Sequence, residues 1–363
     1  MKIAWFTHRD MCHPQAGGVG RTIYEVGKRL ALKGHSFNVI SVGWKDSNAI
    51  DKIDGISIKR SRGNIMAHIR ALHMFNETSP DIVVDDLGHA IPWFTDLLKS
   101  QIGTVFFHHL HRRSLKGQVS MPTRYVISGI ESLYPLIYRR WPFVTESQSS
   151  LNDLLNLGIN ESRITKIPPG IDTDFYKPSI KEEVPTVVYF GGFRDYKRPW
   201  EVLYSLKNSF QEFGNLELIM IGSGPSLDQT IKLSNDLGMS GRVSFVGKVR
   251  DAELRDIVSR SWLNIHTSLT EGYGFSILEA SACGVPTIAY SVPGVGDAIV
   301  DGKNGYLVPD GNRKLMQDII VKFLRNYDEG LARSSREIAL RYSWDETTRA
   351  WESHLNKTIE DFE

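Results

Sequence analysis

Cysteine is scarce in this 363-residue sequence, and neither sign of charge dominates. Two cysteines, Cys12 and Cys283, are too few for the disulfide framework of a secreted domain, so we expect a reducing compartment. The 43 Lys+Arg residues against 42 Asp+Glu residues leave a formal net charge of +1. A protein dedicated to nucleic acid usually has a clear basic excess, and we therefore predict no nucleic-acid partner.

Long apolar runs, a signal peptide and low-complexity tracts are also missing from the sequence. No apolar run approaches the ~20 residues that a membrane-spanning helix needs. The first residues, MKIAWFTH, read as a strand rather than as a signal peptide. We expect a cytoplasmic protein that can still touch the inner face of the cell membrane as a peripheral protein.

Short apolar runs alternate with segments of helical period along most of the chain. The apolar runs predict strands over 2–8, 37–43, 81–86, 104–109, 142–147, 186–193, 216–222, 242–248, 263–268 and 287–290. The helical periods predict helices over 21–34, 64–79, 149–158, 198–213, 251–261, 275–284 and 343–362. This alternation is typical of parallel sheets covered by helices on both faces.

The alternation pauses at 164–185, a segment rich in proline and aspartate that reads as a connection between domains. We therefore predict an α/β protein with two doubly wound, Rossmann-like domains that face a deep cleft. The domains are expected at 1–168 and 169–344, with the helix 345–363 packing back on the first. Ligands of such sheets collect at the carboxyl ends of the strands.

The segment TSLTEGYGFSILEASACGVPTIAYS, residues 267–291, carries the clearest chemical signal. It predicts a strand, a glycine-framed loop (EGYG) and an apolar helix in succession. The first backbone N–H groups of such a helix, together with its dipole, favour an anion and above all a phosphate. Glycines at 272 and 274 let a ligand approach the backbone closely.

Two glutamates frame this loop: Glu271 opens it, and Glu279 lies about one turn inside the helix. A carboxylate pairs well with two adjacent hydroxyls, so Glu279 suits a ribose diol and Glu271 the sugar beyond the phosphates of a nucleotide diphosphate sugar. Solvated surface carboxylates are the alternative. Because Glu279 lies on an apolar helix face, where a buried carboxylate needs partners, we prefer the ligand.

This segment resembles the E-x7-E signature of the retaining glycosyltransferases of family 4 (glycosyl transferases group 1), which have the GT-B fold. The likeness continues through PQAGGVGRTIYEVGKRLALKGH, PFVTESQSSLNDLLNLGINESRITKIPPGIDTDFYKP, YFGGFRDYKRP, LIMIGSGP, FVGKVRDAEL and DGKNGYLVP. It implies that Glu271 contacts the donor sugar and Glu279 the ribose. It also implies donor contacts from Tyr273, Gly274, Phe275 and Ser276, through their backbone, and from Val249.

YFGGFRDYKRP is similar to a family segment whose arginine and lysine hold the donor diphosphate. The lysine matches Lys197, whereas Gly192 stands where the family has its arginine. Arg194, two residues later, is our candidate for the missing charge, with a solvated pair as the alternative. Cations placed there stabilise the negative charge that the leaving diphosphate gains as the glycosidic bond breaks.

In the first domain, the resemblance points to a glycine pair and a histidine. Gly17 and Gly18 precede a helix that is expected to begin near Arg21 and to offer its N-terminus to the donor phosphate. Arg21 itself is either functional or solvated. The family has one histidine near the donor sugar at the end of TVFFHH, for which we choose His108, with His109 as the second choice.

Metal chemistry is not expected. The histidines at 108, 109 and 111 lack a matching carboxylate or cysteine set for zinc. We interpret Asp85 and Asp86 as polar groups at a strand end, because the resemblance implies an enzyme that needs no bound metal and no cofactor.

The resemblance implies a retaining hexosyltransferase that uses a nucleotide-sugar donor and a glycan or lipid-linked acceptor. UDP-sugars are favoured over GDP- and ADP-sugars, and attack on the donor's front face is expected. The alternatives are a GT-B sugar-nucleotide epimerase or phosphorylase, a dinucleotide oxidoreductase suggested only by GGVG, and a non-catalytic carbohydrate- or nucleotide-sugar-binding protein.

The segment 111–143 is unusually basic and aromatic. It carries six Lys and Arg residues against one acid, Glu131, with four tyrosine or tryptophan side chains among them. One hypothesis is a surface that meets anionic lipid headgroups or a lipid-phosphate acceptor. An ordinary solvated pair of helices is the alternative.

Overall fold

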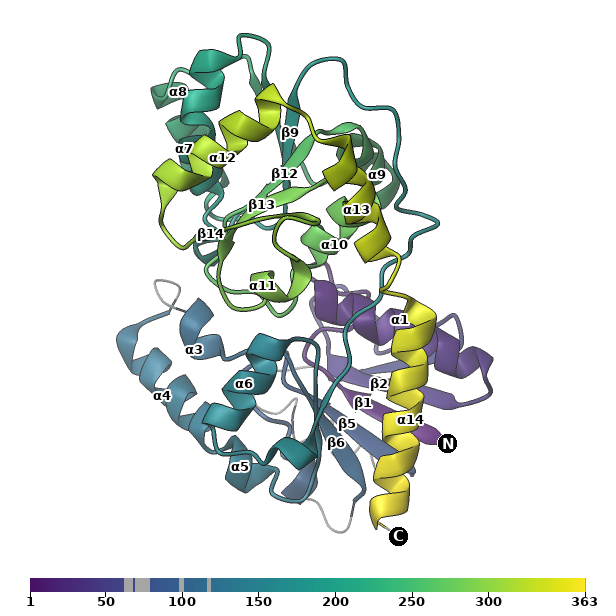
Figure 1. The fold of residues 1–363 in the computed structure, drawn as a ribbon. Coiled ribbons are helices and arrows are strands. Elements are labelled where there is room, and N and C mark those ends of the chain that lie inside the picture. Colours follow the sequence, from purple (N-terminus) through teal and green to yellow (C-terminus); the bar gives the residue numbers. More distant parts are fainter. Residues whose placement is uncertain (62–67, 69–78, 98–100, 116–118, 363) are drawn as a thin grey trace. The chain divides into compact units, whose positions relative to one another are not determined.

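The computed structural model describes residues 1–61, 68, 79–97, 101–115 and 119–362. Figure 1 shows two compact units, each built around its own sheet. Unit 1 combines Met1–Arg112, Ser120–Gly170 and Trp344–Glu363, and unit 2 combines Arg113–Val119 and Ile171–Ser343. The helix predicted over 64–79 falls almost wholly outside the described residues.

The sheet of unit 1 has the strand order β3-β4-β2-β1-β5-β6-β7-β8. All neighbouring strands are parallel except β3 and β4. The strands are β1 Lys2–Phe6, β2 Ser36–Val42, β3 Ile50–Ile53, β4 Ile56–Ser61, β5 Ile82–Asp86, β6 Gly103–Phe107, β7 Phe143–Thr145 and β8 Ile164–Lys166. The helices are α1 Gly18–Leu32, α3 His111–Ser114, α4 Met121–Ser132, α5 Tyr134–Ile137, α6 Gln148–Asn156 and α14 Trp344–Phe362.

Apolar side chains on the two faces of this sheet form two separate cores. On one face, α1 and α14 pack side by side, and Trp351 of α14 lies 4.8 Å, centroid to centroid, from Trp5 of β1. The Thr104 hydroxyl of β6 lies 2.8 Å from Nε2 of His354, which also ties α14 to the sheet. The opposite face packs against α5 and α6 through residues such as Tyr138 and Leu154.

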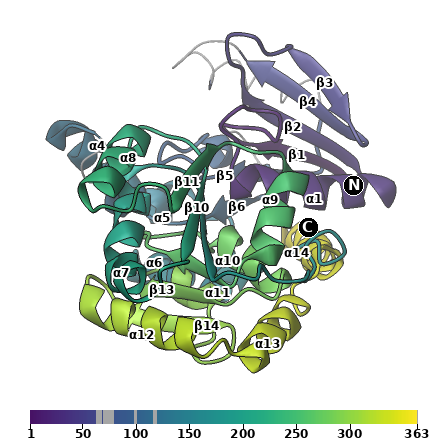
Figure 2. The same cartoon turned by 90° about the horizontal axis from the view of Figure 1, so that it is seen from above.

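Unit 2 has an all-parallel sheet with the order β11-β10-β9-β12-β13-β14. Its strands are β9 Thr186–Phe190, β10 Glu217–Ile221, β11 Val243–Gly247, β12 Leu263–His266, β13 Thr287–Ser291 and β14 Gly305–Pro309. Its helices are α7 Pro199–Glu212, α8 Leu227–Asp236, α9 Asp251–Arg260, α10 Phe275–Ala282, α11 Val295–Ala298, α12 Arg313–Arg325 and α13 Glu329–Ala339. Within unit 2, Figure 2 shows α7 and α12 on one side of the sheet and α9, α10 and α13 towards the other.

The predicted fold class, two doubly wound α/β domains, is therefore confirmed, and every strand that the sequence predicted is present. Within the described residues, four further strands were not predicted: β3, β4, β8 and β14. The hairpin β3–β4 turns at Asp54 and Gly55, whose φ angles are 46° and 83°. An Asp-Gly pair between two short alternating runs is a known hairpin signal that could have revealed it. The segment 164–185, interpreted as a connection between domains, begins with the short strand β8, which pairs with β7.

Candidate functional site

Three loops of unit 2 meet at one edge of its sheet, because β9, β12 and β13 are adjacent and parallel. The loop after β9 holds Gly192, Arg194 and Lys197. The loop after β12 holds Glu271 and leads into α10, and the loop after β13 holds Gly294. The carboxyl edge of a parallel sheet is where ligands of such folds collect.

Lys197 and Glu271 form an ion pair across this edge, with 2.5 Å between Nζ and Oε1. The Ser268 hydroxyl donates to the same carboxylate oxygen at 2.6 Å. Burial alone would raise the Glu271 pKa, but the charge of Lys197 and these hydrogen bonds hold it below its ordinary value. The carboxylate is therefore ionised at neutral pH.

His266, at the end of β12, faces the same carboxylate, with Nε2 3.1 Å from Oε1 of Glu271. Burial lowers the His266 pKa to about 4, against the opposing charge of Glu271. The imidazole is therefore neutral at pH 7. Burial also lowers the Lys197 pKa, but Glu271 outweighs that effect, and the net pKa lies above its ordinary value. At neutral pH the pair thus consists of an ammonium on Lys197 and a carboxylate on Glu271, beside a neutral His266.

Arg198 fastens the β9 loop to the β12 loop. Its backbone is left-handed, with φ 48°, and its guanidinium donates to the carbonyls of Thr267 and Ser268 at 2.7 and 3.0 Å. A further hydrogen bond of 2.6 Å reaches Asp310. Sequence reasoning missed this residue because its role depends on contacts about 70 residues away along the chain.

The side chain of Arg194 runs beside Gly192. A Cβ placed on Gly192 would lie 3.8 Å from Cγ, Cδ and Nε of Arg194. The arginine side chain therefore passes along the space in which a side chain of residue 192 would begin. This geometry supports the interpretation of Arg194 as a substitute for an arginine at 192, which remains a prediction.

Helix α10 begins where the sequence predicted. Its N-cap is Gly274, with φ 85°, a left-handed conformation that favours glycine. Gly294 is also required, since a Cβ there would come within 2.1 Å of the Glu271 carbonyl oxygen. Phe275 and Ser276, in the first turn, are partly exposed, whereas the Tyr273 side chain is buried, so contacts from Tyr273 to a ligand would have to use its backbone.

Glu279 is 7% exposed and accepts a hydrogen bond of 3.1 Å from the Tyr176 hydroxyl. Val249, after β11, packs against the cluster of buried side chains that contains Tyr273 and Ile277. Five predicted donor residues and Glu279 thus lie in or beside α10. With Lys197, Arg194 and Glu271 nearby, unit 2 gathers most of the predicted site.

The other predicted residues lie in unit 1. Gly17 is the N-cap of α1 and Gly18 its first residue, so the helix begins three residues earlier than predicted, with Arg21 in its first turn. A Cβ on Gly17 would meet nothing within 4 Å. No described protein atom therefore fills the space beside the Gly17 backbone.

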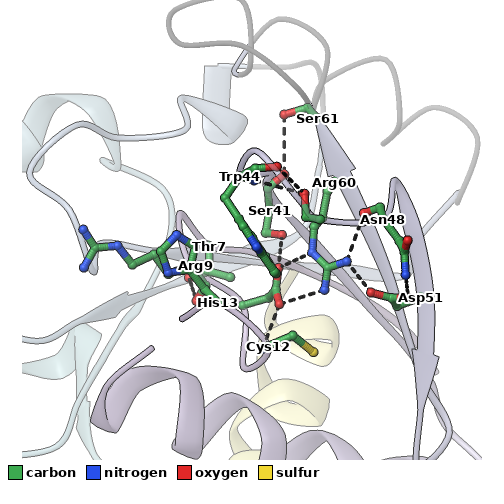
Figure 3. Close-up of polar contacts among 12 residues, drawn as sticks. Thr7, Arg9, Cys12, His13, Ser41, Trp44, Asn48, Asp51, Arg60 and Ser61 are labelled. Atoms are coloured by element: carbon green, nitrogen blue, oxygen red, sulfur yellow. Dashed lines mark hydrogen bonds and ion pairs between the residues drawn. The ribbon is translucent and has the colours of Figure 1, made fainter. Parts of the chain in front are cut away.

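A buried ion-pair network holds the loop between β1 and α1. Figure 3 shows this network around Arg60 of β4, whose guanidinium donates to Asp10 at 2.7 and 3.0 Å and also to Asp51. Asp10 further accepts from the Ser41 hydroxyl and from the Cys12 backbone N–H, at 2.6 and 2.9 Å. Burial would raise the Asp10 pKa, but the Arg60 hydrogen bonds hold it below its ordinary value. The network therefore positions the loop that carries the glycine pair.

His108 is buried between two carboxylates. Its Nε2 lies 2.6 Å from Asp86, its Nδ1 lies 3.5 Å from Glu146, and Glu146 accepts from the Thr22 hydroxyl of α1 at 2.9 Å. Burial lowers the His108 pKa, but Asp86 and Glu146 outweigh it and raise the pKa to about 9. His108 is therefore an imidazolium at neutral pH that links β5, β6, β7 and α1. The alternative, His109, is partly exposed.

Asp85 is also buried, and it accepts from the hydroxyls of Thr95 and Tyr138 at 2.8 and 2.7 Å. Burial raises its pKa to about 6. Across the described ranges, no group of three or more His, Cys, Asp or Glu residues is arranged to hold a metal ion. None of the helices in those ranges is long and apolar enough to cross a membrane.

The chain has two Rossmann-like units, which is the architecture of the GT-B class of proteins. Unit 2 holds an ammonium, a carboxylate and a helix N-terminus at the carboxyl edge of its sheet. The family description "Glycosyl transferases group 1" matches residues 170–340, and "Glycosyltransferase Family 4" matches residues 16–175. The chain belongs to this family of glycosyltransferases.

Solved structures of the same fold cover almost the whole chain. Sucrose-phosphate synthase from Thermosynechococcus elongatus superimposes with a TM-score of 0.82 at 17% identity, covering 99% of both chains. Anabaena Alr3699/HepE in complex with UDP and glucose gives a TM-score of 0.79 at 17% identity, covering 98% of this chain and 100% of that one. Identities this low show the fold alone.

Two curated relatives are similar in sequence. The D-inositol 3-phosphate glycosyltransferase of Gordonia bronchialis is 27% identical over 241 residues, which cover 60% of this chain and 53% of that protein. The N-acetyl-alpha-D-glucosaminyl L-malate synthase of Bacillus anthracis is 23% identical, over 90% of this chain and 89% of that protein. The match therefore spans about half the length of the inositol phosphate relative and most of the malate relative.

Proposed function

We propose that this protein transfers a hexosyl group from a nucleoside-diphosphate sugar, with a UDP-sugar favoured, to a hydroxyl of a glycan or lipid-linked acceptor, with retention of configuration. The observation that carries the proposal is the Lys197–Glu271 pair beside the N-terminus of α10, at the carboxyl edge of the unit 2 sheet.

The leaving group explains why this arrangement suits sugar transfer. As the glycosidic bond breaks, the diphosphate gains negative charge, and fixed cations stabilise that charge more in the transition state than in the ground state. Lys197, Arg194 and the N-terminus of α10 supply the positive charge and dipole. On binding, the diphosphate pairs with Lys197 in place of Glu271. The Glu271 carboxylate can then accept from the hydroxyls of the donor sugar.

Glu279 is proposed to hold the ribose. Its carboxylate is buried, lies on the second turn of α10, and has a hydroxyl partner in Tyr176. A ribose diol would add donors of the same kind, and a buried carboxylate is stabilised by each of them. Backbone amides of Tyr273, Gly274, Phe275 and Ser276 are proposed for the phosphates and sugar, with Val249 beside the nucleotide.

The choice of donor and acceptor draws on the relatives. The Anabaena neighbour was solved with UDP, with UDP and glucose, and with UDP-glucose, which supports UDP as the nucleotide. The relatives' names include inositol phosphate and malate, which are small hydroxyl compounds, so they support a hydroxyl as the accepting group, whereas the glycan or lipid-linked class rests on the family resemblance. The proposed reaction forms a bond between the acceptor oxygen and the anomeric carbon, breaks the bond to the diphosphate, and passes the acceptor proton to that leaving phosphate.

Unit 1 is proposed to bind the acceptor, and unit 2 the nucleotide sugar. Gly17, Gly18 and His108 are the proposed contributions of unit 1 to donor binding, with His109 in place of His108 if the buried imidazolium keeps its two carboxylate partners. No metal or cofactor is required by the proposal. A peripheral position at a membrane is included because the acceptor is proposed to be glycan or lipid-linked.

The test is nucleotide binding followed by turnover. Thermal shifts with UDP, GDP and ADP should be largest for UDP, and the corresponding sugars should then be hydrolysed or transferred by the pure protein. Glu271→Gln should abolish most turnover and Glu279→Gln should weaken UDP binding. Glu182→Gln, which removes a surface carboxylate paired with Arg260 in the same unit, is the matched control and should change neither.

Two alternatives give different results. A GT-B sugar-nucleotide epimerase would return an isomerised donor without consuming an acceptor. A non-catalytic nucleotide-sugar-binding protein would show the UDP shift and no turnover at all. Absence of any nucleotide shift would contradict the proposed function itself.

A further inference from the structure

The segment formed by α4 and α5 in unit 1 has an apolar outer face. Five large apolar side chains on it are between 48% and 71% exposed: Met121, Tyr125, Val126, Leu133 and Leu136. A helix at the surface of a globular protein normally turns charged and polar residues towards solvent. Packing within the chain therefore does not account for the apolar side chains on this face.

The spacing places these side chains on one side. Met121 and Tyr125 are four residues apart, and Leu133 and Leu136 are three apart, so both pairs are neighbours on a helix surface. Leu133 ends α4 in a helical backbone conformation, and α5 begins at the next residue. The apolar side chains thus form one stripe over both helices, which lie along one side of unit 1 (Figure 1).

The opposite face of the same helices is firmly attached to unit 1. Tyr134 and Tyr138 are buried, and their hydroxyls donate to the Ala90 carbonyl at 2.8 Å and to Asp85 at 2.7 Å. Glu131 is fully buried and accepts from Arg112 at 2.9 Å. These contacts fix the rotation of α4 and α5, so the apolar stripe cannot turn inwards without breaking them.

The charges around the stripe have one sign. Between residues 119 and 141 the sole acid is the buried Glu131, whereas Arg124, Arg139 and Arg140 are basic. Arg139 and Arg140 are exposed, although Arg140 also pairs with Asp96 at 2.8 Å. The apolar stripe on α4 and α5 is therefore followed directly in the chain by Arg139, which is exposed, and by Arg140, which pairs with Asp96, while Arg124 of α4 is partly exposed.

We propose that the outer face of α4 and α5 docks on a bilayer that contains anionic lipids. The apolar side chains enter the boundary between headgroups and acyl chains, and the arginines meet lipid phosphates. The Tyr125 side chain suits this boundary because its ring is apolar and its hydroxyl polar. The inference rests on the proposed function in one respect, since it places the membrane contact that a lipid-linked acceptor needs.

A second copy of the chain is the less suitable occupant. A two-fold dimer through this face would place the same patch on both subunits. In such a dimer the apolar side chains would be covered, but residues 119–141 offer no exposed acid to pair with Arg139 of the other copy. An anionic bilayer supplies opposite charge and an apolar phase together.

The test is flotation of the full chain with vesicles at low ionic strength. We expect binding to phosphatidylglycerol–phosphatidylcholine vesicles and little binding to phosphatidylcholine alone. The double variant Tyr125→Glu, Leu136→Glu should weaken binding at least about tenfold, and Arg139→Gln about fivefold, the effect of one basic residue near an anionic surface. Leu32→Glu, at an exposed apolar position of α1 in the same unit, is the matched control and should bind as the wild type does.

Three results would overturn the inference. They are absence of binding to the anionic vesicles, unchanged binding of the double variant, and a lipid-independent dimer that the double variant abolishes. The UDP thermal shift is measured on every variant and should be unchanged, because none of these positions lies in unit 2. A wild type that floats without any UDP shift would support the docking face and contradict the proposed function.

Discussion

The ion pair between Lys197 and Glu271 offers a quantitative test of the site. We expect the substitution Glu271→Gln to lower both stability and turnover while leaving UDP binding largely intact. Glutamine has the shape of glutamate and can still accept from the Ser268 hydroxyl, which donates to Oε1 in the structure. The change therefore removes the negative charge from beside Lys197 and little else.

The burial of the Lys197–Glu271 pair sets the size of the expected loss of stability. Removing one partner of a buried pair costs about 3–5 kcal/mol, because the other charge is left without compensation. Lys197 and Glu271 are 20% and 11% exposed, so water reduces the cost, and we expect a loss of about 3 kcal/mol. The double variant Lys197→Met, Glu271→Gln carries neither charge and should recover at least half of that loss.

The stability that the Lys197–Glu271 pair contributes changes with pH in a definite direction. The Glu271 pKa is depressed in the folded state, so its contribution is present above the unfolded pKa and is lost as the pH falls through the folded pKa. The Lys197 pKa is raised, so its contribution is present below the unfolded pKa and is lost as the pH rises through the folded pKa. The difference between wild type and Glu271→Gln should be constant between about pH 6 and 9 and shrink in acid.

Urea unfolding followed by circular dichroism, at several pH values, measures this free energy of unfolding. A loss below about 1 kcal/mol would refute the reasoning, since it would mean that the pair behaves like a solvated surface pair. Turnover adds an independent check. Normal sugar transfer by a stable Glu271→Gln variant would remove Glu271 from the proposed donor contacts.

Three further predictions concern other parts of the chain. His108 has a folded pKa raised to about 9, so the stability it contributes is present below pH ~6.5 and is lost as the pH rises to ~9. Urea unfolding should show this as a change of about 3 kcal/mol in the free energy of unfolding, and His108→Gln should remove the change. Gly294→Ala should reduce the UDP shift because its Cβ would meet the Glu271 carbonyl, whereas Gly302→Ala, at a similar positive φ with nothing within 4 Å, should not. Cys283 is buried with its pKa raised by burial to about 12, so a thiol reagent should modify Cys12 and spare Cys283 until the protein unfolds.

Ten strands were predictable because each contains a short apolar run, and burial on both faces of a parallel sheet requires such a run. Three of the missed strands had weaker patterns. In β3 and β4, charged and polar residues alternate with isoleucines, and β8 has three residues within a proline-rich connection. The start of α10 was predictable because a glycine loop directly precedes an apolar helical period.

Contacts across the site were not predictable in the same way. The pairing of Lys197 with Glu271 spans 74 residues, and it depends on β9 and β12 being neighbours in the sheet. His266, Ser268 and Arg198 carry no motif of their own. Arg60, the last but one residue of β4, gives no sign in the sequence that it neutralises Asp10, which lies 50 residues earlier.

By itself, the sequence determined the class of the fold, the place of the helix that begins at Phe275, and the residue types gathered around it, because local periodicity and glycine placement depend on near neighbours. Only the tertiary structure decided which of these side chains are charged. Lys197, Glu271, His266 and His108 take their protonation states from burial and from partners that the sheet order brings within hydrogen-bonding distance. The apolar stripe on α4 and α5 was likewise decided by packing, since only the buried tyrosines show which side of the helices faces out.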